Sequence, residues 1–551
     1  MSDHDDDHWR GAVVYQIYPR SFRDSNGDGI GDLAGIVETL PYVASLGVDA
    51  VWISPFFASP MADFGYDVSD YRAVDPMFGT LADADRLIAE AHRLGLKVLV
   101  DLVFAHTSAE HPWFRASRID RDGPHADWYV WADPRRDGSP PNNWLSVFGG
   151  GAWTWEPRRR QYYLHHFLAQ QPKLNLRHPA VMAAIEDIAA WWLARGVDGF
   201  RLDAVDFMAH DPALTDNPPH PERRIALRPY NMQLHVNDLA HADTPGLLAR
   251  LRQVMDRHPG SFAIAEVGSE PARLTPIERA EAYTAALDGG QSRLHMAYTL
   301  GLMKGTGSAA ALRTAIAEVE AHVRAGWLCW AFSNHDVERA ASRWGDGSPA
   351  SARLLNALLL SLRGAVCVYQ GEELGLTEAE VPADRLRDPY GITYYPHFKG
   401  RDGSRTPMPW RHDAAHAGFT DAGPAVEPWL PVPAAHAAAA VDLQEADPDS
   451  VLAGWRRFIA FRKANPALLR GGLDLLATAD PVLGFERSLD DARVVCLFNL
   501  SPQPATAVVP DLPPGATLTP LTGHGWAAVE IGPGGRIDLP PWGAWFGRRG
   551  S

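Results

Sequence analysis

The chain has 551 residues, of which 46% are hydrophobic, and its formal net charge is −16 at pH 7. A negative field of this size argues against nucleic acid or an anionic membrane surface as a partner, whereas it suits a neutral small molecule such as a sugar. No apolar stretch reaches the roughly 18 residues that a membrane span needs. The acidic start of the chain has no basic and apolar leader, so a cytoplasmic location is expected.

Eight short apolar runs recur along the chain, and most of them precede a segment with helical periodicity. The runs are continuous rather than alternating, which is typical of strands buried on both faces of a parallel sheet. The alternation of apolar runs with helical segments predicts a (β/α)8 barrel, with a doubly wound open sheet as the structural alternative. The runs lie at 13–18, 50–55, 97–104, 199–205, 262–267, 294–300, 328–333 and 365–371, and the clearest helical segments at 31–47, 81–95, 179–196 and 351–364.

Two connections are longer than an ordinary loop. The stretch 107–175 is rich in Trp, Gly, Pro, Arg and Asp, and we expect it to form an inserted domain after the third strand. Core packing explains most of its aromatic residues, but Phe148 and Phe167 are expected in a pocket wall. The stretch 209–260 is another long excursion, after the fourth strand, and its Pro-rich segment ALTDNPPHPERR is predicted to be a mobile rim loop.

After about residue 470 the chain changes to short alternating runs between Gly and Pro turns, which is typical of a small antiparallel β domain. The predicted division therefore gives the barrel residues 1–106 and 176–470, the inserted domain 107–175, and the C-terminal β domain 471–551. Three cysteines lie far apart in apolar runs, and we expect them to be buried, reduced thiols.

Three carboxylates stand at or near the ends of three apolar runs: Asp203 in GFRLDAVDF, Glu266 in FAIAEVG and Asp336 in FSNHD. The strand ends of a barrel meet at one face, so these side chains are expected to lie together. Cleavage of a glycosidic bond with retention needs a carboxylate that attacks and a carboxylic acid that protonates the leaving oxygen, and another acidic group can stabilise the positive transition state.

Each acid also has a structural alternative. Asp203 could form an ion pair with Arg201, Glu266 could be a surface residue, and Asp336 could cap a helix. For catalysis Asp203 must be ionised, which Arg201 would favour. Glu266 must be protonated at rest, which apolar neighbours or nearby carboxylates would favour.

The segment DSNGDGIGD, residues 24–32, places oxygen donors at alternate positions, as hard cations such as Ca²⁺ or Mg²⁺ require. It is similar to the start of an EF-hand loop, but Gly35 stands where the bidentate Glu would be, and a strand precedes the loop. A metal-free turn is the alternative. No His or Cys spacing supports zinc, and no organic cofactor is expected. The predicted ligands are Asp24, Asn26, Asp28, the carbonyl of Ile30, and Asp32.

Ten segments in a fixed order resemble those of the α-amylase superfamily of glycoside hydrolases (family 13), and within it the α-glucosidase and oligo-1,6-glucosidase branch. They are VVYQIYPRSFRDSNGDGIGDLAGI, GVDAVWISP, DFGYDVSDY, DLVFAHTS, QPKLNL, GFRLDAVDF, AEV, SNHD, GEELG and GRDGSRTPMPW. The resemblance implies Asp203 as nucleophile, Glu266 as general acid/base, Asp336 as transition-state stabiliser, and a single structural cation. It also implies contacts to the sugar from Asp63, Tyr66, His106, Phe167, Arg201, His335 and Arg401.

The chain departs from this family pattern at two positions. Ala105 precedes His106 where most members have Asn, which puts one hydrogen bond at that strand end in doubt. QPKLN replaces the QPDLN that is common in the branch, which leaves the role of Lys173 open.

Within the resembling branch, the residues after the nucleophile separate linkage preferences. At these positions Ala204 and Val205 are similar to the residues of α-1,4-specific enzymes. Arg401 would close the far end of the pocket, which implies exo action. The expected activity is a retaining exo-α-glucosidase acting on maltose-like oligosaccharides or α-glucosides, with some transglucosylation. The protein is expected to be a monomer or homodimer.

Other activities remain open. Sucrose hydrolysis, isomerase-type glucosyl transfer and oligo-1,6-glucosidase activity are the enzymatic alternatives. The segment RLRDP, residues 385–389, is partly similar to a motif of sucrose-isomerising relatives. A non-catalytic sugar-binding protein is the alternative outside enzymes.

Overall fold

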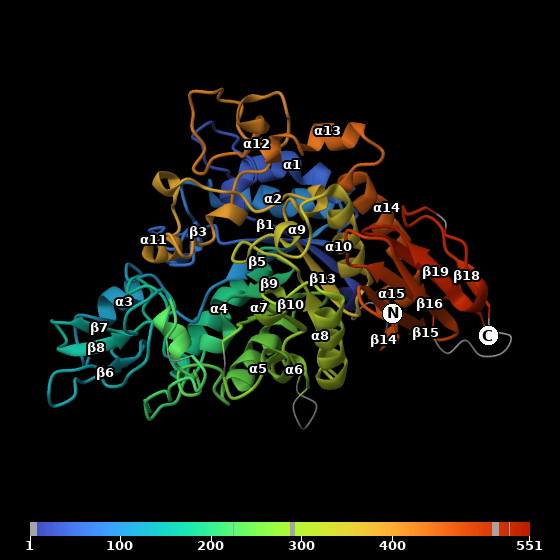
Figure 1. Ribbon diagram of the computed structural model, residues 1–551. Helices are drawn as coiled ribbons and strands as arrows, with labels where there is room; N and C mark the ends of the chain where they lie inside the picture. Colours follow the sequence, from blue (N-terminus) through green and yellow to red (C-terminus); the bar gives the residue numbers. More distant parts are fainter. Residues whose placement is uncertain are drawn as a thin grey trace.

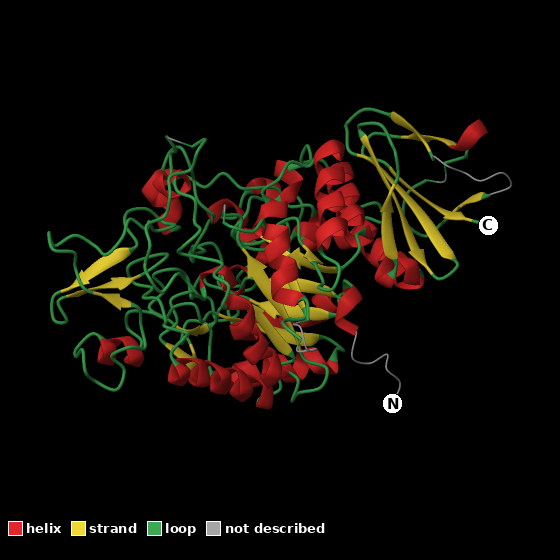
Figure 2. Cartoon of the chain, turned by 90° about the horizontal axis from the view of Figure 1, so that it is seen from below, coloured by secondary structure: helices red, strands yellow, loops and turns green. Residues whose placement is uncertain are grey.

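The computed structural model describes residues 8–223, 225–270, 272–286, 292–509, 517–527 and 529–550. The acidic segment 1–7, from which we argued that no leader is present, lies outside the described residues. Three bodies follow one another across the molecule: a central barrel with the small sheet of an inserted domain on one side and the C-terminal sheet on the other (Figures 1 and 2). In the described residues, no helix combines the length and the apolar character needed to cross a membrane.

The barrel consists of eight parallel strands in the order β11-β10-β9-β5-β2-β1-β13-β12. A parallel bridge from Ala297 to Leu328 joins the two edges, so the sheet is nearly closed and the open-sheet alternative is excluded. Each predicted apolar run contains one of these strands, which confirms the fold class. Their bounds are β1 (Val13–Ile17), β2 (Ala50–Ile53), β5 (Lys97–Leu102), β9 (Gly199–Leu202), β10 (Phe262–Val267), β11 (Met296–Thr299), β12 (Cys329–Trp330) and β13 (Ala365–Tyr369).

Helices cover the outside of the barrel (Figure 2). Capping boxes start two of them, since Thr80 and Asp83 satisfy each other's backbone N–H groups in α2, as Thr275 and Glu278 do in α6. The helices are α1 (Leu33–Ser45), α2 (Leu81–Arg93), α4 (Pro179–Ala194), α5 (Thr244–Met255), α6 (Pro276–Thr284), α7 (Leu300–Met303), α8 (Ala309–His322), α9 (Ala340–Arg343), α10 (Pro349–Ser361), α11 (Pro389–Tyr394), α12 (Ala434–Ala437), α13 (Val441–Ala446), α14 (Val451–Ala464) and α15 (Pro466–Arg470).

The long excursion 209–260 is not irregular throughout, because α5 lies in its second half, where no helix was predicted. Pro245 and Gly246 lie in the first turn, where proline is tolerated, and they hide the helical periodicity that follows. Leu248 and Leu251 are buried by this helix against the barrel.

The stretch between β5 and α4 contains α3 (Pro112–Ser117) and a three-stranded antiparallel sheet, with β6 (Trp131–Ala132), β7 (Trp153–Glu156) and β8 (Gln161–Leu164). Its aromatic residues pack mainly on one another. The rings of Phe114 and Trp131 are stacked at 5.7 Å, and Trp144 is 1% exposed beside Trp153. These contacts agree with the core-packing explanation of the aromatic cluster.

The last part of the chain forms a five-stranded antiparallel sheet and a separate pair, β17 with β19. The aromatic rings of α14 and β20 connect it to the barrel, since Phe458 lies 5.2 Å from Phe546. The three cysteines are free and buried, as predicted. The strands are β14 (Gly472–Leu475), β15 (Val482–Leu489), β16 (Ala492–Asn499), β17 (Ala505–Val508), β18 (Leu518–Pro520), β19 (Arg536–Leu539) and β20 (Ala544–Arg549); a further pair beside the barrel is β3 (Phe57–Ala58) with β4 (Asp70–Val74).

Candidate active site

A cavity of about 460 Å³ lies where the ends of β9 and β10 meet the long connections of the chain. Most of the predicted site residues line it. Arg201 and His335 do not, because both are fully buried one layer below the lining side chains. The predicted residues on the cavity wall are Asp63, Tyr66, His106, Phe148, Phe167, Asp203, Glu266, Asp336 and Arg401.

Arg201, on β9, binds the two candidate reacting acids with one guanidinium group. Its Nη1 lies 2.6 Å from Oδ1 of Asp203, and its Nη2 lies 2.7 Å from Oε2 of Glu266. The same Nη1 donates to Oδ1 of Asp101 at 2.9 Å. The backbone N–H of Ala204 donates to Oε2 of Glu266 at 3.0 Å, which fixes that carboxyl group beside the Asp203 segment.

Asp101 is a site residue that the sequence analysis missed. It is buried below the cavity, and besides Arg201 it accepts hydrogen bonds from the Tyr66 hydroxyl at 3.0 Å and from the Trp52 indole at 3.2 Å. A carboxylate inside the apolar run KVLVDLVF was the available signal, because a charge is rarely buried without a partner.

Electrostatics separate the roles of Asp203 and Glu266. Burial raises the pKa of Glu266 to about 8, against the effect of Arg201 and with a further contribution from Asp203. Burial raises the pKa of Asp203 to about 7, opposed by Arg201 and supported by Asp101. One guanidinium cannot balance three carboxylates, so a proton is retained in this cluster, and Glu266 has the higher affinity for it. This arrangement suits Asp203 as the nucleophile and Glu266 as the general acid.

Asp336 is held ionised. Burial by itself would raise its pKa, but the positive charges of Arg401 and Arg405 outweigh burial and lower the pKa below its usual range. Oδ1 of Asp336 lies 3.1 Å from Nη1 of Arg401 and 2.6 Å from Nη2 of Arg405. A permanently negative group in this position can stabilise a developing positive charge. Arg405 was not predicted.

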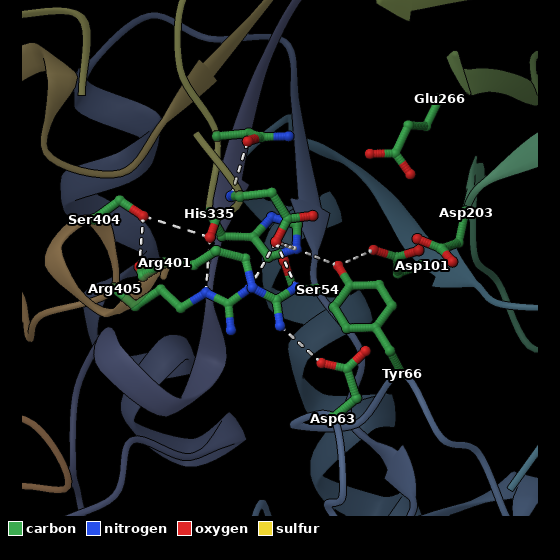
Figure 3. A network of polar contacts seen from close by, with 12 residues as sticks. Ser54, Asp63, Tyr66, Asp101, Asp203, Glu266, His335, Arg401, Ser404 and Arg405 are labelled. Carbon is green, nitrogen blue, oxygen red and sulfur yellow. Dashed lines mark hydrogen bonds and ion pairs between the residues drawn. The ribbon is translucent and has the colours of Figure 1, made fainter. Parts of the chain in front are cut away.

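Arg401 lines the cavity and bridges three carboxylates, one of which, Asp63, is seen beside it in Figure 3. Its guanidinium lies 2.9 Å from Asp63, 2.8 Å from Asp388 and 3.1 Å from Asp336. Gln171 donates to the other oxygen of Asp63 at 3.2 Å. Asp388, which lies in the RLRDP segment, therefore has a structural partner in this site.

His335 holds Tyr66 in place rather than facing the cavity. Its Nε2 lies 2.6 Å from the Tyr66 hydroxyl, and its Nδ1 lies 2.7 Å from Nε2 of Gln16. Burial lowers the pKa of His335 well below its usual range, so the ring is neutral at pH 7. His106 does line the cavity, and its Nε2 lies 2.9 Å from the Tyr66 carbonyl oxygen. Burial lowers its pKa to about 4, so it is neutral as well.

An aromatic wall faces the acids. Phe167 lies 5.9 Å from Phe148 and 4.9 Å from Phe207, and Phe148 lies 5.0 Å from Tyr390, as measured between ring centroids. All four rings line the cavity. A sugar in the cavity therefore meets apolar faces on one side and carboxyl groups on the other.

Lys173 supports the segment that follows Asp203. Its buried ammonium donates to the carbonyl oxygens of Phe207 and Met208, the latter at 3.1 Å. Burial lowers its pKa to about 7. Ala105, the other departure, packs with Ala204 and Phe207, and its carbonyl accepts from the N–H of Leu174 at 3.1 Å.

Side chains of the loop at 24–32 accept hydrogen bonds from the loop's own backbone. Asp24 accepts from the N–H groups of Gly27 and Gly29, and the side chains of Asn26 and Asp28 each accept from the N–H two residues later. Asp32 caps α1. The three aspartates do not bring three carboxylate oxygens within 4.8 Å of one another, so a cation here would also need the amide oxygen of Asn26 and the carbonyl of Ile30. The donors are all hard oxygens, which fit Ca²⁺ or Mg²⁺.

The two raised pKa values predict a bell-shaped pH profile. As the pH falls below about 7, Asp203 takes up a proton and can no longer attack. As the pH rises through about 8, Glu266 loses the proton that the leaving oxygen needs. We therefore expect kcat/KM for an α-glucoside to be highest between these values, because kcat/KM reports the free enzyme. A profile that stays flat on the alkaline side would contradict the protonated state of Glu266.

Comparison with known proteins gives matches over nearly the whole chain. The α-amylase catalytic domain matches residues 16–471. A probable α-glucosidase of Rhizobium meliloti (strain 1021) is 52% identical over 555 residues, which cover 99% of this chain and 97% of the relative. An oligo-1,6-glucosidase of Parageobacillus thermoglucosidasius is 36% identical over 537 residues, 91% of this chain and 92% of the relative. The crystal structure of the α-glucosyl transfer enzyme XgtA has a TM-score of 0.92 at 51% identity and covers 98% of this chain and 99% of its own.

Proposed function

The chain belongs to the α-amylase family of glycoside hydrolases, and we propose that it is a retaining exo-α-glucosidase that releases terminal α-1,4-linked glucose from maltose-like oligosaccharides and other α-glucosides. The observation that carries the proposal is the pair Asp203 and Glu266, bound to the one guanidinium of Arg201 at a cavity that Arg401 lines. The sugar unit that is transferred, a terminal glucose, is small and neutral, in keeping with the net charge.

In the first step, the ionised Asp203 attacks the anomeric carbon from the β face, while Glu266 donates its proton to the glycosidic oxygen. The leaving alcohol departs, and a β-glucosyl ester forms on Asp203. Asp336, which Arg401 and Arg405 keep negative, stabilises the positive charge that develops on the sugar ring.

In the second step, Glu266, now ionised, takes a proton from water, and the water attacks the same carbon from the α face. The ester bond to Asp203 breaks and α-glucose is released. If a sugar hydroxyl replaces the water, the same step gives a new glucoside, which is the transglucosylation that we propose alongside hydrolysis. The similarity to the α-glucosyl transfer enzyme XgtA supports this second outcome.

The proposal of exo action is supported by the bridge between Arg401 and three carboxylates at the cavity wall, which would block further sugar units beyond the terminal glucose. The α-1,4 preference rests on Ala204, whose small side chain follows the nucleophile and lines the cavity. A larger residue there would narrow the space next to the scissile bond.

Parallel incubation with maltose, isomaltose and sucrose tests the substrate assignment. We expect kcat/KM for maltose to exceed that for isomaltose by at least about tenfold, since small steric differences in a pocket are worth this much. Replacement of Ala204 by valine is expected to lower the ratio. Turnover of isomaltose above maltose would assign the enzyme to oligo-1,6-glucosidases, and new disaccharides from sucrose would assign it to the isomerase type.

We also propose that Asp24, Asn26, Asp28, Ile30 and Asp32 hold one divalent cation of structural function. Removal of the ion with a chelator should lower Tm by about 5 °C, and Ca²⁺ or Mg²⁺ should restore it, because an ion that binds only the folded state stabilises it. Asp28→Ala should abolish this response, whereas Asp127→Ala, an exposed aspartate outside the loop, should retain it. A Tm that no cation changes would leave the loop as a metal-free turn.

A further inference from the structure

The outer part of the cavity is where the leaving group must lie. Glu266 protonates the leaving oxygen, and the residues just after it on the chain, Gly268, Ser269 and Glu270, line the cavity. Phe148 and Tyr390 form a second part of the cavity wall, next to Arg401, whose guanidinium lies 5.2 Å from the Phe148 ring. The leaving group of a glucoside therefore passes between these two walls.

Each of these walls carries a positive charge. Lys304, at the end of α7, donates from Nζ to the Ser269 hydroxyl at 3.0 Å, on the side of the acid. On the second wall, the guanidinium of Arg228 lies over the rings of Tyr390 and Phe398 at 5.4 and 5.3 Å and donates to the Tyr390 hydroxyl. Arg223, on the same rim segment as Arg228, also lines the cavity.

These three cations differ from the arginines of the inner site. Arg201, Arg401 and Arg405 are each paired with carboxylates. In the part of the chain that the structure describes, no carboxylate oxygen lies within 4.0 Å of a charged nitrogen of Arg223, Arg228 or Lys304. An unbalanced positive charge is therefore left at the mouth of a cavity in a protein whose net charge is −16.

The acidic residues near this mouth do not cancel the charge. Asp206 is already engaged, because it accepts from the Tyr283 hydroxyl at 2.7 Å and the Gly268 N–H at 2.8 Å, and it lies 3.5 Å from Arg279. Glu270 is the other carboxylate on this part of the lining. Among the described residues of this lining, three cations without a carboxylate partner therefore stand against one carboxylate, Glu270, and the outer cavity has a net positive charge.

We infer that the outer cavity selects α-glucosides whose leaving group carries an anionic oxygen group, a phosphate or a carboxylate, held by Arg228 on one wall and Lys304 on the other. A planar guanidinium stacked on aromatic rings keeps its outward N–H groups free for the oxygens of such an anion. The same residues would favour anionic acceptors in glucosyl transfer. The inference rests on the proposed function, because it concerns the leaving group of that reaction.

The test compares three disaccharides that share the terminal glucose: maltose, maltobionate, and maltose with a phosphate on O6 of the reducing glucose. We expect kcat/KM for the better anionic substrate to exceed that for maltose by roughly fivefold to tenfold, as a few partly exposed ion pairs allow. The advantage should shrink with added salt, because salt screens exposed charges. The anionic substrate with the larger increase in kcat/KM over maltose identifies the group, phosphate or carboxylate, that the cavity accepts.

Variants assign the effect to the named residues. In Arg228→Gln and Lys304→Gln, the ratio of anionic to neutral kcat/KM should fall towards one. Arg324→Gln, which changes an exposed arginine that follows α8 and does not line the cavity, should keep the wild-type ratio. Tm of each variant establishes that it is folded. If maltose is hydrolysed but the ratio of anionic to neutral kcat/KM is one or below, this inference alone is overturned. If no α-glucoside is hydrolysed, the proposed function is overturned as well.

Discussion

Asp203→Asn is expected to lower kcat/KM for maltose by on the order of 10⁵-fold to 10⁶-fold, as the loss of a nucleophile does in other enzymes with a covalent intermediate. The amide keeps the size of the side chain but cannot form the glucosyl ester. It also leaves Arg201 with one carboxylate fewer, so the substitution should not add an unpaired negative charge to the buried cluster. Steady-state kinetics on maltose and on an aryl α-glucoside measure the loss.

The stereochemistry of rescue identifies the role of Asp203. In Asp203→Ala, azide should enter the space of the carboxylate and attack an activated α-glucoside from the β face, which gives β-glucosyl azide. The exposed Asp127→Asn serves as the matched control and should retain full activity. Residual turnover above about one per cent of wild type in a pure Asp203→Asn preparation would show that another group attacks the sugar.

Glu266→Ala is expected to have an effect that depends on the leaving group. With maltose, whose leaving alcohol needs a proton, kcat/KM should fall by about 10³-fold to 10⁴-fold, the upper range for general acid catalysis. With 2,4-dinitrophenyl α-glucoside, whose leaving group needs no proton, kcat/KM should fall by less than about tenfold. The alkaline limb of the pH profile should disappear together with the group that the buried site keeps protonated.

Azide also distinguishes the role of Glu266 from that of Asp203. In Glu266→Ala the β-glucosyl ester on Asp203 still forms, so azide should attack it from the α face and give α-glucosyl azide, the opposite anomer to the one from Asp203→Ala. The exposed Glu110→Gln is the control for an acid without a catalytic role. An equal loss on both substrates would contradict the assignment of Glu266 as the general acid.

The barrel was predictable because its strands are buried on both faces and therefore appear as continuous apolar runs. Even the short strand β12, Cys329–Trp330, lies inside a predicted apolar run. Asp203 and Glu266 were predictable for the same reason, since an acid at the end of a buried strand is unusual unless the site uses it. Helix α5 was missed because Pro245 and Gly246 obscure its start.

The partners of these acids were less accessible, because they depend on contacts between distant segments. Arg401 meets Asp63 across 338 positions of the chain, and Arg405 meets Asp336 across 69. Nothing in the local sequence indicates that His335 uses both ring nitrogens on Gln16 and Tyr66 and therefore lies below the cavity. That Arg228 and Lys304 have no carboxylate partner among the described residues likewise follows only from the three-dimensional positions of the neighbouring acids.

The central claim is double displacement at Asp203 with Glu266 as acid and base, and time-resolved NMR of the protein with maltose tests it most directly. The account predicts that α-glucose is the first product and that the β anomer rises only later by mutarotation. Early β-glucose would contradict the account, because a single displacement by water would then replace the glucosyl ester on Asp203.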